Sequence, residues 1–165
     1  MRARPWWRRS GASILILGAC LCVPCASFAA APADPLAGRW TLDRAHSTYG
    51  PGAEPRKRES FTCERVKGVL RCSIRSEREN GRRVVGSFAA PYDGKPHPAA
   101  GIPGVDAVVL RRVDAFVADA TFLDHGQPVY GYRSTRSRDG RTLTIASVDP
   151  VTRAALHSVV VYRRR

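Results

Sequence analysis

A chain of 165 residues with a formal net charge of +13 is long enough for one domain with a modest core, and its length argues against two. Lysines and arginines number 27 against 14 acids, a balance that fits a solvated cationic surface or, as the alternative, attraction to anionic partners. Nucleic acid is not expected among them, because the sequence carries an export signal and shows neither an aromatic and basic stacking motif nor a recognition helix.

Residues 1–29 are predicted to be a signal peptide that forms an N-terminal signal helix. A basic opening precedes the apolar run 11–28, and Ser27 and Ala29 fit the −3 and −1 positions of a cleavage site. A retained membrane-spanning helix is the alternative, but the run includes Pro24 and is short against the roughly 20 apolar residues that a span needs. Cleavage predicts a periplasmic or secreted protein with a net charge of about +9.

A second alternative concerns how the leader is processed. Leu17-Gly18-Ala19-Cys20 resembles a bacterial lipobox, in which Cys20 becomes a lipid-modified N-terminus. Residues 21–31 are apolar and small, however, where a lipoprotein usually has a polar tether. We expect membrane attachment only through the leader or through this lipid anchor.

Residues 30–37 are expected to be a short linker, and residues 38–165 a single domain. No stretch beyond the leader longer than about ten residues has helical periodicity, whereas short alternating runs separated by turn signals recur. This pattern predicts an all-β domain, an antiparallel up-and-down meander. The expected strands are 38–43, 58–66, 69–78, 82–90, 105–113, 116–124, 128–137, 141–148 and 156–163.

Most connections are short enough for hairpins, with turn signals such as Lys67-Gly68 and Asn80-Gly81. At Asn80-Gly81 a strict two-residue turn places Ile74 opposite Ser87; we favour a bulge that places it opposite Phe88. Residues 45–56 and 91–104 are rich in Gly and Pro and are expected to be irregular.

Two cysteines are expected to form a cross-strand disulfide. A two-residue turn at Lys67-Gly68 pairs Cys63 with Cys72 at a non-hydrogen-bonded position, where the Cα atoms lie about 4.5 Å apart. They are the only cysteines that remain after cleavage, and the exported compartment is oxidising. The alternative, a redox-active or metal-binding pair, lacks a C-x-x-C spacing and a nearby histidine.

Several short motifs occur along the chain: Gly38-Arg39-Trp40-Thr41-Leu42, then Ser47, Tyr49, Pro51 and Gly52, then Tyr92-Asp93-Gly94-Lys95 with Pro98, the run 139–144 and Val160-Val161-Tyr162. In this order and spacing they resemble small exported bacterial lipocalin-like proteins of uncharacterised function. The T-D-Y signature of typical lipocalins is absent.

The resemblance implies a lipocalin-like barrel or a partly open barrel. In lipocalins the tryptophan of the G-x-W motif, here Gly38 and Trp40, closes the base of the barrel against an arginine, for which Arg163 is the candidate. An eight-strand barrel of this type holds one small ligand or is filled by its own side chains.

Candidate catalytic and metal sites are not found in the sequence. The four histidines lie far apart without metal-ligand spacing, no G-x-S-x-G motif occurs, and the glycines of 101–104 precede no helix. We therefore expect no enzyme activity, no metal and no cofactor.

Two functions are favoured over a third, a weak hydrolase or isomerase. The first is a monomeric, non-enzymatic binder of a small apolar or anionic molecule, with a basic rim that attracts anions. The rim candidates are Arg82, Arg83, Arg111, Arg112 and Arg133. The second is a cell-envelope interaction module or inhibitor that binds an anionic envelope component, such as lipopolysaccharide or acidic lipid, through its basic surface and loops.

Overall fold

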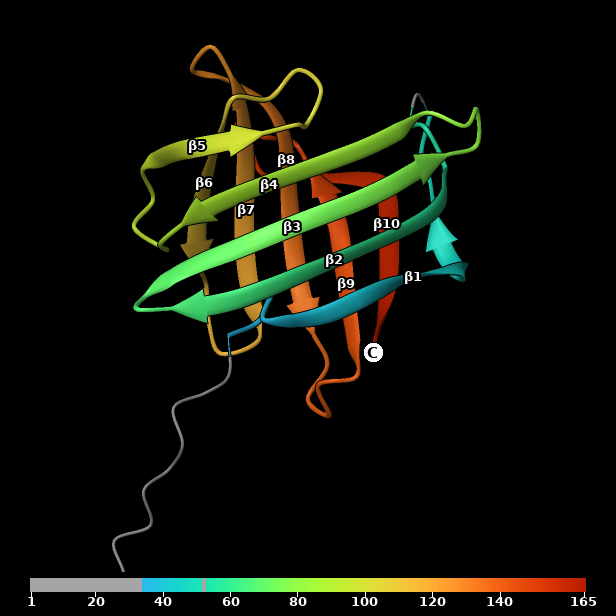
Figure 1. Ribbon diagram of the computed structural model, residues 1–165, viewed down its shortest axis with the longest axis horizontal. Coiled ribbons are helices and arrows are strands. Elements are labelled where there is room, and N and C mark those ends of the chain that lie inside the picture. The colour runs from blue at the N-terminus through green and yellow to red at the C-terminus, as the bar shows by residue number, and fades with distance from the viewer. Residues whose placement is uncertain (1–33, 52) are drawn as a thin grey trace, which may run out of the picture. The chain divides into compact units, whose positions relative to one another are not determined.

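A computed structural model of the protein describes residues 34–51 and 53–165. The predicted signal helix, the lipobox at Cys20 and most of the linker lie outside these residues. The described part consists of ten strands (Figure 1): β1 Gly38–Thr48, β2 Arg56–Val66, β3 Val69–Arg78, β4 Arg83–Ala90, β5 Pro96–Ala100, β6 Ala107–Arg112, β7 Val117–Asp124, β8 Gln127–Arg136, β9 Thr142–Val148 and β10 Ala155–Arg164.

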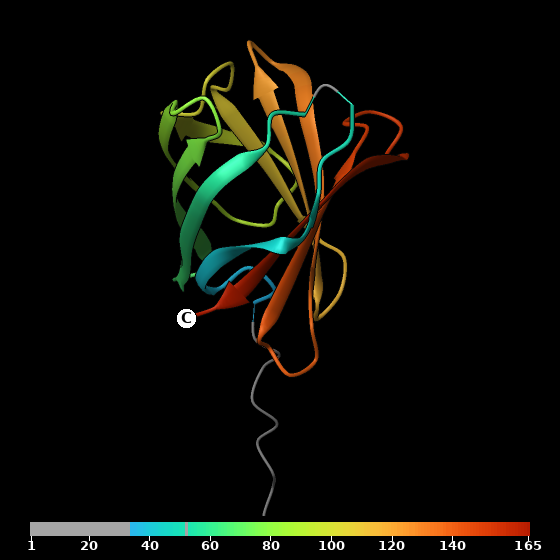
Figure 2. The ribbon, with the colours of Figure 1, turned by 90° about the vertical axis from the view of Figure 1, so that its right-hand side faces the viewer.

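The strands form a closed antiparallel barrel with meander topology. Each strand pairs with its neighbour in sequence, and β1 pairs with β10 to close the sheet, with Leu42 opposite Tyr162. Figure 2 shows the sheet curving back on itself. The predicted all-β meander is confirmed, the partly open alternative is wrong, and the barrel has ten strands where nine were expected. Among the described residues, no helix is long and apolar enough to cross a bilayer.

The strand that the sequence did not predict is β5, which lies inside the segment expected to be irregular. Pro96 and Pro98 occupy alternate positions in it, so both missing N–H groups face the same neighbouring strand. The Ala99 N–H donates toward β6, to Asp106 O at 2.8 Å, which leaves the prolines on the β4 side. There the pairing shrinks to Ser87 with Ala100 and Phe88 with Ala99.

The hairpin of β2 and β3 has the predicted register. Cys63 lies opposite Cys72, and the two form the expected disulfide with Cα atoms 4.2 Å apart. Lys67 and Gly68 adopt φ angles of 48° and 84°, the left-handed pair that a two-residue type I′ turn requires.

The hairpin of β3 and β4 has a different register from the one expected. Ile74 lies opposite Gly86, and Cys72 opposite Phe88. The reason is a three-residue turn, since the Arg78 N–H donates to Arg82 O. Gly81 provides the positive φ, 83°, that such a turn needs at its last residue.

The core lies at one end of the barrel interior. Its fully buried large side chains include Trp40, Leu70, Leu110, Leu143 and Tyr162, each at most 2% exposed. These residues come from strands around the whole barrel, because alternate residues of every strand point inward. The other end of the interior is hollow.

Candidate functional site

The barrel contains a cavity of about 790 Å³. It is bordered by the β1–β2, β3–β4, β5–β6 and β9–β10 connections and by the start of β8, which we call the open end. Small-molecule sites in proteins typically measure about 300–1,000 Å³. The cavity is therefore large enough for one small ligand.

The opposite end of the barrel is the closed end. It comprises the segments 34–39, 64–71, 89–96, 111–117, 135–142 and 163–165. The Asp34 carboxylate accepts hydrogen bonds from Tyr92 Oη at 2.8 Å and from Arg65 Nη1 at 3.5 Å. Arg136 Nη1 donates to Asp34 O at 3.1 Å. These bonds hold the N-terminal segment across the ends of β2, β4 and β8.

Trp40 seals the interior of the closed end. Its side chain is 1% exposed, and its Nε1–H donates to Leu36 O at 2.9 Å. Gly38 has a φ of 147°, and a Cβ at this position would lie 3.2 Å from the indole nitrogen. Glycine therefore allows the indole ring to lie close to the backbone, so both residues of the G-x-W motif have structural roles here.

The arginine next to Trp40 is Arg164 and not Arg163. The Arg164 guanidinium carbon lies 6.0 Å from the ring centroid, while Arg163 Nε donates to Asp43 Oδ2 at 2.8 Å. Tyr162 points inward on β10, so side-chain alternation directs Arg164 toward the base and Arg163 outward. Apolar residues on both faces of this strand hid that orientation in the sequence.

One wall of the cavity is aromatic. Phe122 makes edge-on contacts with Phe88 and Tyr132, with ring centroids 6.0 and 5.7 Å apart, and Tyr130 stacks on Tyr132. Such contacts fix ring positions, and the rings present a large apolar surface. The cavity lining also includes the Cys63–Cys72 disulfide.

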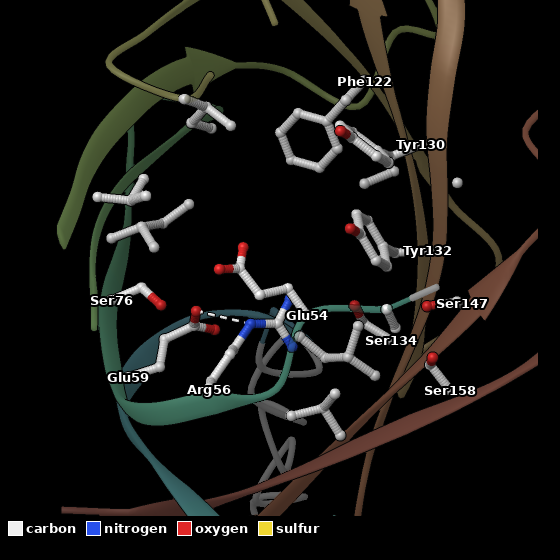
Figure 3. A pocket seen from close by; sticks show the side chains of 18 of the residues that line it. Glu54, Arg56, Glu59, Ser76, Phe122, Tyr130, Tyr132, Ser134, Ser147 and Ser158 are labelled. Atoms are coloured by element: carbon white, nitrogen blue, oxygen red, sulfur yellow. Dashed lines mark ion pairs between the residues drawn. The ribbon is translucent and has the colours of Figure 1, made fainter. Parts of the chain in front are cut away.

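The facing wall carries an ion pair. Arg56 Nε lies 2.9 Å from Glu59 Oε2 (Figure 3), although the N–H is not aligned for a hydrogen bond. Tyr162 Oη donates to Glu59 Oε1. Glu59 is 9% exposed, so a charged pair and a phenol meet in a largely desolvated place.

A β-bulge directs Arg56 into the cavity. The pairing with β3 shifts between Arg56 and Arg58, so Arg58 lies opposite Glu77 and Arg56 opposite Arg78. Lys57 and Arg58 both contact Glu77 on the outer face. Without the bulge, alternation from Glu59 would place Lys57 inward and Arg56 outward.

Burial keeps the phenols of Tyr132 and Tyr162 protonated at neutral pH. Burial, assisted by the neighbouring Glu59, raises the pKa of Tyr162 well above its ordinary value. Burial also raises the pKa of Tyr132, whose hydroxyl points into the cavity (Figure 3). Burial alone would lower the pKa of Arg56, but the neighbouring Glu59 carboxylate raises it, so its guanidinium stays charged.

Unused hydrogen-bonding groups gather on the same wall. Ser76 Oγ and Tyr49 Oη are buried and have no hydrogen-bond partner among the described residues. Ser76 is 6% exposed, lies opposite Glu59 in the sheet and points into the cavity. Arg78 donates from Nη1 to Glu54 O at 3.2 Å, while its Nε lies 3.8 Å from Glu54 Oε2. A buried polar group without a partner is unfavourable unless a water or a ligand satisfies it.

The charges that line the cavity sum to one positive charge. They belong to Arg56, Arg78 and Arg82 and to Glu54 and Glu59. With the protonated phenols and the serine hydroxyls, the wall is rich in hydrogen-bond donors. Such a wall suits a ligand group that is anionic or accepts hydrogen bonds.

The five predicted rim arginines lie in different places. Arg82 lines the cavity at the open end. Arg83 is exposed on β4, and Arg133 pairs with Asp119 through two hydrogen bonds of 2.9 and 3.0 Å. Arg111 and Arg112 belong to the closed end, where Arg112 Nε donates to Asp114 O.

Sequence reasoning missed the two arginines inside the cavity. Arg78 had a usable signal, because it lies an even number of residues after Cys72, which shares its face of β3. Arg56 had none, because its direction depends on the bulge.

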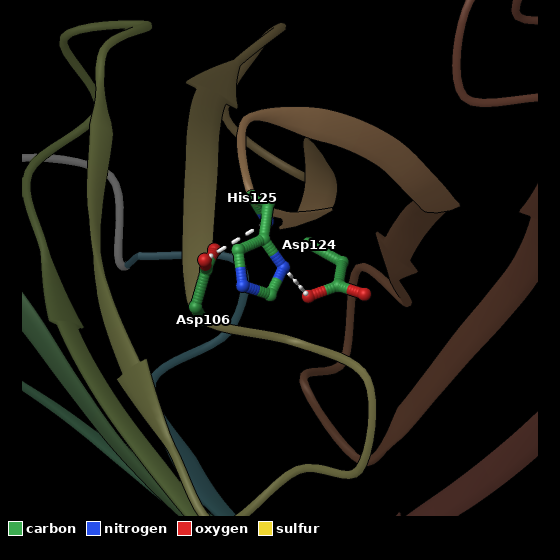
Figure 4. A group of neighbouring side chains, drawn as sticks. All are labelled: Asp106, Asp124 and His125. Carbon is green, nitrogen blue, oxygen red and sulfur yellow. Dashed lines mark hydrogen bonds and ion pairs between the residues drawn. The ribbon is translucent and has the colours of Figure 1, made fainter.

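A separate group of three side chains lies on the surface near the β7–β8 turn (Figure 4). Its members are Asp106, Asp124 and His125, whose potential ligand atoms lie within 4.8 Å of one another. The backbone N–H of His125 donates to Asp106 Oδ2 at 2.9 Å, and the ring Nδ1 of His125 lies 2.7 Å from Asp124 Oδ1. Hydrogen bonds of the turn account for the group without an ion.

In comparisons with known proteins, no family model, curated protein or solved structure matches this chain.

Proposed function

We propose that this protein is an exported, non-enzymatic binder of one small amphipathic molecule, which occupies the barrel cavity. The observation that carries the proposal is a cavity of about 790 Å³ with one aromatic wall and one wall of hydrogen-bond donors. The apolar part of the ligand lies against Phe88, Phe122 and Tyr132. Its anionic or hydrogen-bond-accepting group lies at Ser76 and Arg78.

The unpaired groups support the position of the ligand's polar end. Ser76 Oγ has no partner among the described residues, and Arg78 makes only a long contact with the Glu54 carboxylate. A ligand oxygen between these two side chains would satisfy both. Arg56 is less suited to this role, because Glu59 already neutralises it.

A binding role accounts for the interior better than a catalytic role does. His157 lines the cavity but has no carboxylate partner among the described residues. The hydrogen bonds of the other histidines to carboxylates involve Asp43, Asp93 and Asp124, which lie outside the cavity lining. The serine Ser158 accepts a hydrogen bond from the Gly50 N–H, which is a structural role. The proposal extends to a monomer in the periplasm or outside the cell, with a lipocalin-like way of holding its ligand.

The first test is native mass spectrometry of the protein purified from its own cell envelope, before and after denaturation. We expect an added mass that is lost on denaturation and that identifies the ligand. The same spectra report cleavage after Ala29, lipid at Cys20 and the disulfide. A bare protein that also fails to bind added amphiphiles would contradict the proposal.

A second test uses an anionic apolar dye, 8-anilinonaphthalene-1-sulfonate, and the neutral dye Nile red. Ala120 and Ser147 line the cavity, and the variants Ala120→Phe and Ser147→Trp add bulk inside it. We expect each to weaken dye binding by about tenfold or more, because the ligand volume is lost. Ala89→Trp on the outer face of β4 is the matched control. Circular dichroism checks folding, and equal binding by all variants would place the dyes elsewhere.

A further inference from the structure

Nearly all of the net positive charge lies at the closed end. The segments of the closed end contain 13 of the 23 lysines and arginines that follow residue 33, but only five of the 14 acids. The rest of the barrel, including the open end, carries ten basic and nine acidic side chains. The asymmetry is a property of the fold, because the basic residues come from six segments that are far apart in the sequence.

The arrangement of ion pairs strengthens this asymmetry. Outside the closed end, most basic side chains have an acidic partner, as in Arg44 with Glu79 and Arg82 with Glu54. At the closed end, Arg65 approaches Asp34 and Arg163 pairs with Asp43. Asp114 and Asp139 of the closed end instead accept hydrogen bonds from backbone N–H groups of their own turns. Arg138 is exposed there without an ion pair in the described part of the chain. Its charge therefore faces solvent.

Apolar side chains protrude among these charges. Val66, at the end of β2, and Val113 and Phe116, in the β6–β7 turn, belong to the closed end and are 38%, 53% and 41% exposed. A hollow of about 200 Å³ between the β6–β7 and β8–β9 turns is lined by Phe116, Arg136 and Arg138. Asp139 also lines it, and its carboxylate accepts hydrogen bonds from the Ser137 hydroxyl and the Arg141 N–H. An apolar ring beside two guanidinium groups suits a lipid phosphate whose acyl chains begin next to it.

We infer that the closed end docks on an anionic phospholipid bilayer, with the open end of the cavity directed away from it. Basic residues near a membrane are attracted by its negative surface potential, and protruding apolar side chains enter the headgroup region. The first described residue, Asp34, also lies at this end. The inference rests on the outer surface and is independent of ligand binding in the cavity.

The test is sedimentation of the purified protein with vesicles of phosphatidylcholine, alone or with about a third phosphatidylglycerol. We expect binding to the anionic vesicles that falls as salt is raised, because salt screens surface charges. The variant R138Q/R141Q removes two exposed charges of the closed end. It should lower the partition coefficient by about tenfold or more, since each basic residue contributes about fivefold near such a surface.

Matched controls separate this face from general basicity. R75Q/R83Q removes two exposed arginines outside the closed end and should change the partition coefficient by less than about threefold. Phe116→Ser should weaken binding, whereas Val151→Ser at the open end should not. Equal losses from the two arginine pairs, no binding by the unchanged protein, or binding to heparin without binding to vesicles would each overturn the inference.

Discussion

Arg56 and Glu59 form an ion pair inside the barrel, with 2.9 Å between Nε and Oε2. Tyr162 donates a hydrogen bond to the same carboxylate from the other side of the seam between β1 and β10. This hydrogen bond links β2, which carries the pair, to the last strand, β10. The Arg56–Glu59 pair also places charges at the edge of the cavity, where burying a neutral side chain would cost less desolvation free energy.

Glu59→Gln should lower the free energy of unfolding by about 2–3 kcal/mol, because it leaves the Arg56 charge half-desolvated and unpaired. The side-chain exposures of 16% for Arg56 and 8% for Glu59 support a substantial effect. Urea unfolding measures it. The double variant R56Q/E59Q should recover part of the loss. If its loss of unfolding free energy equals the sum of the losses of R56Q alone and E59Q alone, the pair is not coupled.

The disulfide between Cys63 and Cys72 should stabilise the barrel without being needed for its fold. The two residues are nine positions apart, and loop-closure entropy predicts a loss of about 2–3 kcal/mol for Cys63→Ala with Cys72→Ala. Thermal unfolding of the double variant tests the size of the loss. An unchanged circular dichroism spectrum at 25 °C is expected, and a disordered spectrum would make the bridge essential to folding.

Local hairpin geometry could be predicted from the sequence. Lys67-Gly68 defines a two-residue turn, and that turn determines the register of β2 with β3 and hence the disulfide. The β3–β4 register failed because Asn80-Gly81 fits both a two-residue and a three-residue turn. Only the position of Arg82, whose carbonyl accepts the Arg78 N–H, distinguishes them.

The candidate site could be predicted only in part, because it depends on irregularities and on barrel closure. Side-chain alternation on β3 places Arg78 inside, but the direction of Arg56 depends on a bulge that has no sequence signature. The rim arginines were chosen from their charge alone. Arg111 and Arg112 lie at the closed end. The unpredicted strand β5 and the closure of the barrel decide which connections surround the opening.

Trp40→Phe should destabilise the closed end by about 1–3 kcal/mol. Phenylalanine keeps an aromatic ring beside Phe61, whose centroid lies 6.4 Å away, but it leaves the Leu36 carbonyl without the indole donor. Thermal unfolding measures the change. Trp40→Ala also removes the ring and should lose about 3–5 kcal/mol. Equal losses for the two variants would mean that the hydrogen bond and not the ring is what matters.

Asp43→Asn should make the unfolding free energy of the barrel less dependent on pH in the acidic range. Hydrogen bonds from His46 and Arg163 lower the pKa of the Asp43 carboxyl from 3.8 to about 2. A carboxyl group whose pKa is lower in the folded state than in the unfolded state stabilises the protein at pH values above its unfolded-state pKa. This contribution disappears as the pH falls through the folded-state pKa. The unfolding free energies of the unchanged protein and the variant should therefore differ at pH 5 and converge between about pH 4 and 2.

Urea midpoints at a series of pH values measure this convergence. Glu64→Gln is the control, because Glu64 is exposed on β2 and forms no ion pair within the described residues. The Asp43 carboxylate, by contrast, bridges β1 to Arg163 on β10, the pair of strands that closes the barrel. Its protonation should loosen the seam before the rest of the sheet. Backbone hydrogen exchange of β1 and β10 should therefore rise first on acidification, and uniform exchange across all strands would contradict a local role for Asp43.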